Sequence, residues 1–314
     1  MRAIGRILSV DIFDQPFFAR SSLLLKGSIM IEVSQLSFLY REGEDLLLKD
    51  INLVIPDGSF VGITGAAGSG KSTLTYALNG IIPHCYPGDF YGSVKIEGID
   101  TCEASLTDAS RLVGSVCQDV DSQIVTSVVE DEILYGLENF SVPKDQVEGR
   151  LNDALAAMGI EDLRYRSIAG LSGGQKQKVA VASVIALKPR VLILDEPTAE
   201  LDPASSLAVF ELLESYARNQ GTTVVVVEQK IALLSRFADS VLVLDDGRIR
   251  FQGSPAEVLE HSDELLEMGV NCPRSTSLVN RLKQRGLATG SAVRDVDGAV
   301  RVCSDLLSAK GAVA

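Results

Sequence analysis

The chain has 314 residues, of which 46% are hydrophobic, so it is long enough for about two globular domains of roughly 150 residues each. A formal net charge of −13 argues against a nucleic-acid partner, because binding a phosphate backbone needs clustered Lys and Arg. The five cysteines lack the spacing of a zinc or redox site and suit a reducing cytoplasm. The best candidate for a membrane span, residues 179–187, is much shorter than the roughly 20 apolar residues required, so any membrane role is expected to be peripheral.

The first 29 residues differ in character from the rest of the chain. Residues 11–16, Asp-Ile-Phe-Asp-Gln-Pro, interrupt the apolar pattern, so the segment does not resemble a secretory signal with a clean apolar core. From Met30 the sequence alternates as a half-buried strand does. We expect residues 1–29 to be an N-terminal extension, either disordered or a start-site artefact, with Met30 as the true start. A peptide from before Met30 in mass spectra of the native protein would contradict this.

A glycine-rich loop follows the apolar run 60–63. Residues 65–73 read GAAGSGKST and fit G-x-x-x-x-G-K-[ST], which cradles phosphates between a strand and a helix. The glycines let backbone N–H groups approach the phosphate oxygens, and the helix that opens near Gly70 directs its positive dipole end at the same anion. Lys71 would reach the β- and γ-phosphates, and the Ser72 hydroxyl would ligate Mg²⁺. A turn that binds nothing is the alternative, but the motif's parts all occur in the required order. The expected triphosphate-binding residues are Gly65, Gly68, Ser69, Gly70, Lys71, Ser72 and Thr73.

Strand and helix patterns alternate along the rest of the chain. Turns are expected at 41–44 and 56–58, and the helix after the phosphate loop is expected to end near 79–80. Residues 83–92 hold two prolines and two glycines and are predicted to be a loop. The predicted strands are 93–99, 112–116, 190–194 and 222–227, and the predicted helices are 142–158, one from Ser172, and 203–218. This alternation indicates an α/β fold with a mainly parallel sheet and helices on its faces.

Two carboxylates, Asp195 and Glu196, directly follow the apolar run 191–194. A carboxylate at a strand end beside the phosphate loop can hold Mg²⁺, and its neighbour can polarise an attacking water. We therefore predict that Asp195 binds metal and that Glu196 catalyses hydrolysis of a nucleoside triphosphate. A solvated Asp-Glu turn is the alternative, which the four preceding apolar residues disfavour.

A third motif, LSGGQ at 171–175, identifies a family. Together with residues 65–73 and with Asp-Glu-Pro-Thr at 195–198, it makes residues 30–260 resemble an ABC-type ATPase. Ser172 would cap the following helix, whose free N–H groups form an anion site. In the family this site meets the γ-phosphate bound by the opposite subunit, which implies a two-fold or pseudo-two-fold dimer with ATP between subunits. The resemblance thus adds Ser172, Gly173, Gly174 and Gln175 to the residues expected to bind ATP.

The resemblance also implies the architecture. It is a P-loop ABC-ATPase cassette with a mainly parallel sheet core, an antiparallel β subdomain, a helical signature subdomain and a small C-terminal extension. The expected boundaries are 30–265 for the ATP-binding domain and 266–314 for the extension. In the extension, Leu278, Leu282 and Leu287 are predicted to line one face of a helix pair, followed by a short strand at 299–302. The family's C-terminal domain assists dimerisation, and a floppy tail is the alternative.

Further residues match family positions one at a time. Tyr40 lies where an aromatic ring stacks on adenine, with a core tyrosine as the alternative. Gln118 resembles the glutamine that touches Mg²⁺ and senses the membrane partner, so it is a predicted catalytic and metal-binding residue. Residues 199–202 resemble the D-loop, with Asp202 near the dimer seam. Glu200 is bulkier and more charged than the residue usual there, so the detailed geometry of the seam stays open.

The main departure from the family is Gln229. It stands where the family usually places a switch histidine that contacts the γ-phosphate. A glutamine amide donates a hydrogen bond but carries neither a proton nor a positive charge. Losing one transition-state stabiliser commonly costs about 10² to 10³ in rate. We therefore expect slow hydrolysis at the site built on Lys71, with Gln229 as a catalytic residue, while the intact signature serves a partner's site.

Several segments resemble the ATPase subunits of energy-coupling factor transporters, which supply vitamins, their precursors or transition-metal ions. These segments are residues 79–84 followed by Gly88 and Gly92, residues 119–123, 129–132 and 135–139, and residues 268–273 with Leu282 and Lys283. The implied cofactors are ATP and Mg²⁺. The implied partners are a second ABC ATPase subunit and an integral membrane transport subunit, with no nucleic acid and no covalent membrane anchor. The implied location is peripheral, at the cytoplasmic face of the cell membrane.

Two other functions stay open from the sequence. A regulator that dimerises on ATP and hydrolyses little is compatible with Gln229. A soluble ABC protein of DNA repair fits less well, because no coiled-coil or zinc insertion separates Lys71 from the signature and the charge is unfavourable. The resemblance also implies that selectivity for the transported compound resides in the membrane subunits.

Overall fold

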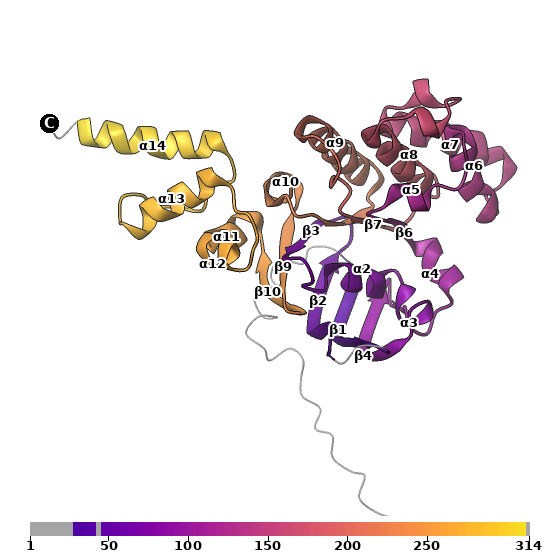
Figure 1. Cartoon of the computed structure of the whole chain (residues 1–314), viewed down its shortest axis with the longest axis horizontal. Helices are drawn as coiled ribbons and strands as arrows, with labels where there is room; N and C mark the ends of the chain where they lie inside the picture. Colours follow the sequence, from indigo (N-terminus) through magenta and orange to yellow (C-terminus); the bar gives the residue numbers. More distant parts are fainter. Residues whose placement is uncertain (1–27, 42–44, 312–314) are drawn as a thin grey trace, which may run out of the picture.

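The computed structural model describes residues 28–41 and 45–311. The predicted extension 1–29 lies outside these residues except for its last two, and the predicted turn 41–44 lies outside them except for Arg41. The described chain contains two sheets, helices on the larger sheet, and a helical C-terminal part that projects to one side (Figure 1). Within residues 28–41 and 45–311, no helix combines the length and the apolar character needed to cross a membrane.

The larger sheet has six strands in the order β10-β9-β3-β8-β7-β6. All neighbouring pairs are parallel except β9 with β10. Every residue of β3, β7 and β8 is buried, as expected for strands covered on both faces. The strands predicted at 112–116, 190–194 and 222–227 are confirmed to within a residue at each end. The strands are Phe60–Gly65 (β3), Val113–Val116 (β6), Val191–Asp195 (β7), Thr223–Val227 (β8), Ser240–Asp245 (β9) and Arg248–Gly253 (β10).

The smaller sheet has four antiparallel strands in the order β2-β1-β4-β5. They are Ile29–Tyr40 (β1), Leu48–Pro56 (β2), Gly88–Ile96 (β4) and Ile99–Asp100 (β5). Buried and more exposed residues tend to alternate along β1 and β2, so one face packs on the core. This sheet confirms the antiparallel subdomain, and the turn predicted at 56–58 is present between β2 and β3.

The prediction of a loop at 83–92 is correct only for residues 85–87. The short helix α3 (Ile81–His84) covers the first two residues of this range, and β4 begins at Gly88. The glycines are required by strand pairing instead of by a turn. A Cβ on Gly88 would lie 2.2 Å from the Leu39 carbonyl oxygen, and one on Gly92 would lie 2.3 Å from that of Ser34. Pairing with β1 therefore overrides the local turn signal.

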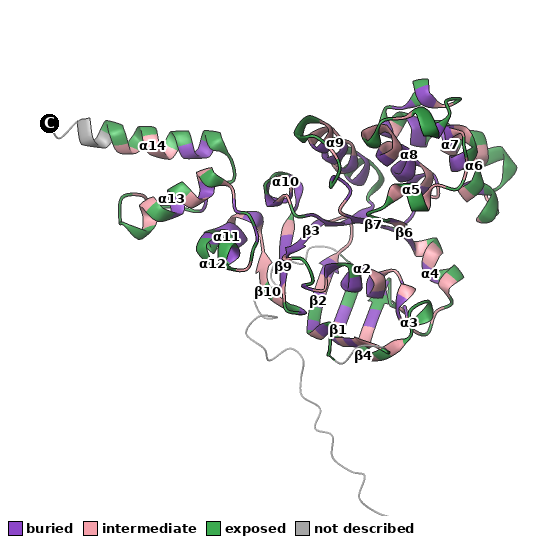
Figure 2. Ribbon diagram, viewed as in Figure 1, coloured by how far each residue is buried: buried purple, intermediate pink, exposed green. Residues whose placement is uncertain are grey.

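Two sets of side chains cover opposite faces of the larger sheet. Leu192 and Leu194 pack in a core with the helices α6 to α10, whereas Val191 and Ile193 pack in a second core with α2 and the smaller sheet. Figure 2 shows buried residues concentrated where these layers meet. The helices are Lys71–Leu78 (α2), Leu106–Leu112 (α4), Val120–Gln123 (α5), Val129–Asn139 (α6), Lys144–Met158 (α7), Gly173–Ile185 (α8), Pro203–Gln220 (α9) and Ile231–Phe237 (α10). They include the predicted helices at 142–158 and 203–218 and the one from Ser172, and α6 to α8 form the helical subdomain.

The C-terminal part contains α11 (Pro255–Glu260), α12 (Ser262–Glu267), α13 (Arg274–Gln284) and α14 (Val296–Gly311). The predicted strand at 299–302 is wrong, because these residues lie within α14, which packs on α13. The predicted leucine face is also wrong. Leu278 and Leu287 are exposed, and α13 instead buries Thr276, Val279 and Asn280. The proposed boundary at 265/266 falls within α12 and stays a prediction.

Candidate functional site

The phosphate loop joins the end of β3 to the start of α2, as predicted. Two of its glycines are required by the backbone. Gly65 has φ 150°, and a Cβ there would lie 2.2 Å from the Leu244 carbonyl oxygen. Gly70 has φ 100°, and its Cβ would lie 2.8 Å from the Leu47 carbonyl oxygen. An L side chain at either position would strain the loop and push it from the sheet.

Lys71, the first residue of α2, points back into this loop. Its Nζ donates to the carbonyl oxygens of Ala66 at 2.7 Å and Gly65 at 3.0 Å, and only 6% of the residue is exposed. Burial lowers the pKa of the ammonium, while the nearby carboxylates of Glu196 and Asp195 oppose this shift. The three predicted charged groups therefore lie close together.

Asp195 ends β7 and is buried beside Ser72. Burial raises the pKa of its carboxyl, and the Ser72 hydroxyl partly offsets that rise. Its Oδ1 is buried without a hydrogen-bond partner, as is the Ser69 hydroxyl in the phosphate loop. Buried polar atoms are normally paired, so these two atoms are suited to contact a ligand. Carboxylate and hydroxyl oxygens suit Mg²⁺, which usually takes few protein ligands and completes its shell with phosphates and water. No cluster of three His, Cys, Asp or Glu capable of holding a metal occurs within 28–41 and 45–311.

Glu196 lies between two side-chain amides. Gln118 Nε2 donates to Glu196 Oε2 at 3.1 Å, and Gln229 Nε2 donates to Glu196 Oε1 at 2.7 Å. Gln118 follows β6, Glu196 follows β7 and Gln229 comes shortly after β8, so three neighbouring parallel strands bring these residues to one edge of the sheet. The structure thus assembles all three predicted catalytic residues.

Sequence reasoning missed the residues that flank Gln229. Glu228 is 1% exposed and accepts a hydrogen bond from the Thr198 hydroxyl and from the backbone N–H groups of Gln229 and Lys230. The Lys230 ammonium donates to the backbone of the turn that begins at Thr198. The available signal was two charged residues at the first and third positions after the apolar run of β8. Their partners lie about 30 residues away in the sequence, so the pattern alone did not identify them.

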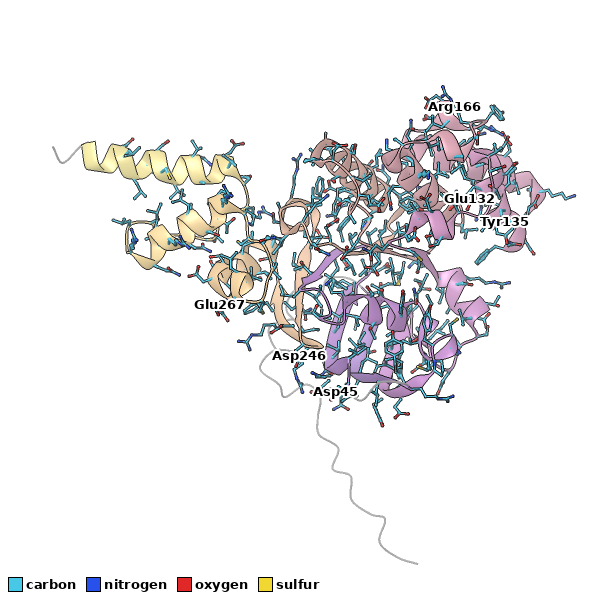
Figure 3. All side chains as sticks on the ribbon, viewed as in Figure 1. Asp45, Glu132, Tyr135, Arg166, Asp246 and Glu267 are labelled. Carbon is cyan, nitrogen blue, oxygen red and sulfur yellow. The ribbon has the colours of Figure 1, made fainter. Side chains whose placement is uncertain are left out.

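The loop after Gln118 is fixed from several sides. Gln123 Oε1 accepts from the Cys117 N–H at 2.9 Å. Glu132, on α6 and labelled in Figure 3, is buried and accepts from the N–H groups of Val125 at 3.0 Å and Thr126 at 2.8 Å. The ion pair between Lys176 Nζ and Asp121 Oδ1, at 2.7 Å, ties the loop to α8. Sequence reasoning did not assign these supporting roles.

The signature residues form a capping box at the start of α8. The Ser172 hydroxyl accepts from the Gln175 N–H at 3.3 Å, and the Gln175 side chain accepts from the Ser172 N–H at 3.0 Å. Ser172 and Gly173 are exposed. Ser172, Gly174 and Gln175 line a cleft of about 330 Å³ that shares no lining residue with the cleft of about 490 Å³ beside Glu196 and Gln229. Within the described chain the signature is therefore not joined to this chain's own catalytic cleft.

Tyr40 ends β1 and is half-buried. Its ring lies edge-on to Phe38, with the centroids 4.8 Å apart, and 6.4 Å from the ring of Tyr86. Tyr86 in turn lies 5.8 Å from Tyr76 on α2. This row of rings links the end of β1 with the helix of the phosphate loop. The adenine-stacking role of Tyr40 stays a prediction.

A buried strand, a glycine loop that begins a helix, and carboxylates at neighbouring strand ends define a P-loop nucleoside triphosphatase. Residues 48–199 match the family described as "ABC transporter". A putative ABC transporter ATP-binding protein from Pyrococcus horikoshii is 40% identical over 82% of this chain and 91% of its own length. The energy-coupling factor transporter ATP-binding protein EcfA1 of Caldanaerobacter subterraneus is 36% identical over 86% of this chain and 97% of its own length. The chain therefore belongs to the ABC transporter ATP-binding proteins, and its resemblance to the energy-coupling factor type is confirmed.

Solved structures agree on the fold. The structure of cbiO1 from Clostridium perfringens, described as part of the ABC transporter complex cbiONQ, has a TM-score of 0.69 and 32% identity over 82% of this chain and 99% of that one. A dimeric ATP-binding cassette, MJ0796, bound to ADP and phosphate has a TM-score of 0.63 and 26% identity over 72% of this chain and 99% of that one. The predicted ABC-ATPase fold and the ATPase activity are confirmed.

Proposed function

We propose that this chain is one half of an ATPase pair that energises import of a vitamin, a vitamin precursor or a metal ion through an integral membrane subunit. The observation that carries the proposal is the cluster of Glu196 with Gln118 and Gln229, close to Lys71 of the phosphate loop. The relatives support the transport role, because they are named as transporter ATP-binding proteins and the cbiO1 protein is part of a transporter complex.

The phosphate loop would bind the triphosphate of ATP. Lys71 would exchange its bonds to loop carbonyls for bonds to the β- and γ-phosphates, and the unpaired Ser69 hydroxyl would gain a partner. Tyr40 would stack on adenine. Gly65, Gly68, Gly70 and Thr73 complete the proposed cradle.

Ser72, Asp195 and Gln118 are the residues that would hold Mg²⁺. When bound, Mg²⁺ would neutralise charge on the β- and γ-phosphates. The unpaired Oδ1 of Asp195 supports this role, because it is a buried anionic oxygen without another partner. Coordination would also offset the burial that raises the pKa of this carboxyl.

Glu196 would act as the base that accepts a proton from the attacking water. The two amides that contact its oxygens would fix its orientation. Neither amide carries a positive charge, which would weaken the carboxylate as a base. Gln229 would also donate a hydrogen bond toward the γ-phosphate. Since it cannot be protonated as histidine can, we propose that hydrolysis at this site is slow.

The signature would complete a second site in a dimer. Ser172, Gly173, Gly174 and Gln175 present the start of α8 to solvent, where its N–H groups suit a phosphate bound by another subunit. The dimeric MJ0796 cassette supports this arrangement. The companion is a second copy or a second ABC ATPase, and the pair would lie at the cytoplasmic face of the membrane, bound peripherally to the transport subunit.

The alternative of an ATP-dependent regulator with little hydrolysis rests on Gln229 alone. It is less favoured, because the matched relatives are named as transporter subunits. Co-purification from detergent-solubilised membranes distinguishes the two functions. We expect the chain to elute with an integral membrane protein and a second ATPase subunit, with ATP hydrolysis in the mixture. A chain that elutes alone and turns over no ATP would contradict the transport proposal.

A further inference from the structure

The ammonium group of Lys230 contacts the turn that follows β7 and the first turn of α9. Its Nζ donates to the carbonyl oxygens of Thr198 at 2.6 Å and Leu201 at 3.2 Å, and to the Ser206 hydroxyl at 3.0 Å. An ammonium has three donors, so its hydrogen-bonding capacity is fully used. Among the residues that the structure describes, no carboxylate lies within 4.0 Å of it. Lys230 thus holds the backbone of the turn through hydrogen bonds and not through an ion pair.

Glu228 also holds this turn. Its Oε2 accepts a hydrogen bond from Thr198, and its Oε1 accepts from the N–H groups of Gln229 at 2.9 Å and Lys230 at 3.1 Å. The carboxylate is almost completely buried, which is tolerable only because these donors satisfy it. The segment 228–230 and the turn 198–201 are therefore joined by two independent sets of hydrogen bonds.

Gln229 stands between these two residues. Its amide contacts Glu196, and Glu196 lies two residues before Thr198. A displacement of the turn 198–201 must therefore either move the segment 228–230 with it or break the bonds of Lys230 and Glu228. The turn ends at Asp202, which caps α9, so its far end is also fixed.

We infer that Lys230 is a positioning residue that holds Gln229 and the turn 198–201 in one arrangement for ATP hydrolysis. The inference rests on the proposed function and on the expectation from the sequence that residues 199–202, which resemble the D-loop, lie near the dimer seam. Association of the subunits would press on the turn, and Lys230 would transmit that displacement to the Gln229 amide and to Glu196. Lys230 itself touches neither ATP nor the attacking water.

The test compares Lys230→Met with Lys230→Arg and with Arg236→Met, in the complex that the chain forms with its co-purifying subunits. Arg236 is a matched control, because it also joins α10 to α9, through Glu211 at 3.4 Å, but on the surface and away from the turn. For Lys230→Met we expect kcat to fall about tenfold or more, because small displacements of catalytic groups have large effects. The KM for ATP and the affinity of the separate chain for ATP should stay within about twofold, since the phosphate loop is unchanged. Lys230→Arg should recover part of kcat, and Arg236→Met should behave as wild type.

A second variant keeps the test decisive if Lys230→Met does not fold. Ser206→Ala removes one of the three acceptors and should lower kcat by about two- to threefold, while the urea midpoint of unfolding falls only modestly, because two bonds of the ammonium remain. Equal kcat in wild type, Lys230→Met and Ser206→Ala would overturn the inference, and so would an equal loss in Arg236→Met. A wild-type complex that hydrolyses no ATP would overturn the proposed function as well. Wild-type hydrolysis with a fully active Lys230→Met variant would overturn this inference alone.

Discussion

The phosphate-loop region and the signature region, both proposed to bind phosphate, lie in different settings. Lys71 and Asp195 are buried in the core of the sheet, their positions set by strands on both sides. Ser172 and Gly173 are exposed at the start of α8, where a capping box of Ser172 and Gln175 forms the helix end. The side chains of the first region are positioned by contacts within one chain. The second region instead presents free backbone N–H groups to solvent. The difference supports the proposal that each chain supplies one half of each of two shared sites, and that the two halves are unlike.

The largest effect is expected from Glu196→Gln, next to Asp195 of the phosphate-loop region. The change keeps the shape but removes the base, so kcat should fall about 10² to 10³-fold while ATP still binds. ATP-bound pairs should then accumulate, as seen by size-exclusion chromatography with light scattering. Glu211→Gln, at an exposed residue on α9, is the control. Unchanged turnover in Glu196→Gln would remove Glu196 from the mechanism.

Lys71→Ala should weaken ATP binding to the separate chain by about 10²-fold, because it removes a buried cation that faces the phosphates. Isothermal titration measures this directly. The matched control is Lys188→Ala, since Lys188 is half exposed and pairs only weakly with Asp153 at 3.5 Å. Equal affinity in wild type and Lys71→Ala would refute the assignment of the phosphate loop.

Gly173→Asp tests the exposed region without disturbing the buried one. A Cβ at Gly173 meets no atom within 4 Å, and an acid in the first turn of a helix is favourable, so the separate chain should fold and bind ATP normally. A negative charge would repel the partner's phosphate, and ATP-dependent association should weaken about tenfold or more. Gly173→Asn is the uncharged control. Association that survives the charge would show that the signature does not face a phosphate.

Gln229→His should raise turnover by about tenfold, because an imidazole can also carry positive charge toward the γ-phosphate. Steady-state phosphate release from the assembled complex is the measurement. The gain should be larger below about pH 7 than above about pH 8, since more of the introduced imidazole is protonated at the lower pH. No gain at any pH would show that Gln229 does not limit the rate.

The smallest effect concerns stability. Burial raises the folded-state pKa of Asp195 above the ordinary value of 3.8, so its charged form destabilises the chain at neutral pH. That cost falls as pH decreases through the raised pKa toward 3.8. Without Mg²⁺ and ATP, Asp195→Asn should therefore raise the urea midpoint slightly at about pH 7 and hardly at about pH 4. A lower midpoint at neutral pH would contradict the attribution to burial.

The parts predicted correctly from sequence depend on local patterns. Residues 65–73 carry loop, lysine and helix start together, and the strands at 191–195 and 223–227 are uniformly apolar apart from their ends. The missed parts depend on distant partners. Gly88 and Gly92 look like turn residues, but β1 pairs closely with them. Residues 299–302 include two valines, yet packing on α13 makes them helical, because β propensity is weak against tertiary context.

The same distinction separates the proposed catalytic residues from the residues that support them. Glu196 and Gln118 follow apolar strands and match family positions, so the sequence indicates them. Lys230 and Glu132 act through hydrogen bonds to backbone groups of other segments. A backbone acceptor or donor leaves no trace in residue type, so only the fold reveals these roles.

Sedimentation velocity of the Glu196→Gln chain, mixed with its co-purifying ATPase subunit, tests the central claim most directly. We predict that ATP with Mg²⁺ shifts the material to a dimer, and that Lys71→Ala or Gly173→Asp in the same background prevents the shift. A dimer that forms equally without ATP, or no association at any ATP concentration, would contradict a shared site built from the buried cradle of one chain and the exposed signature of another.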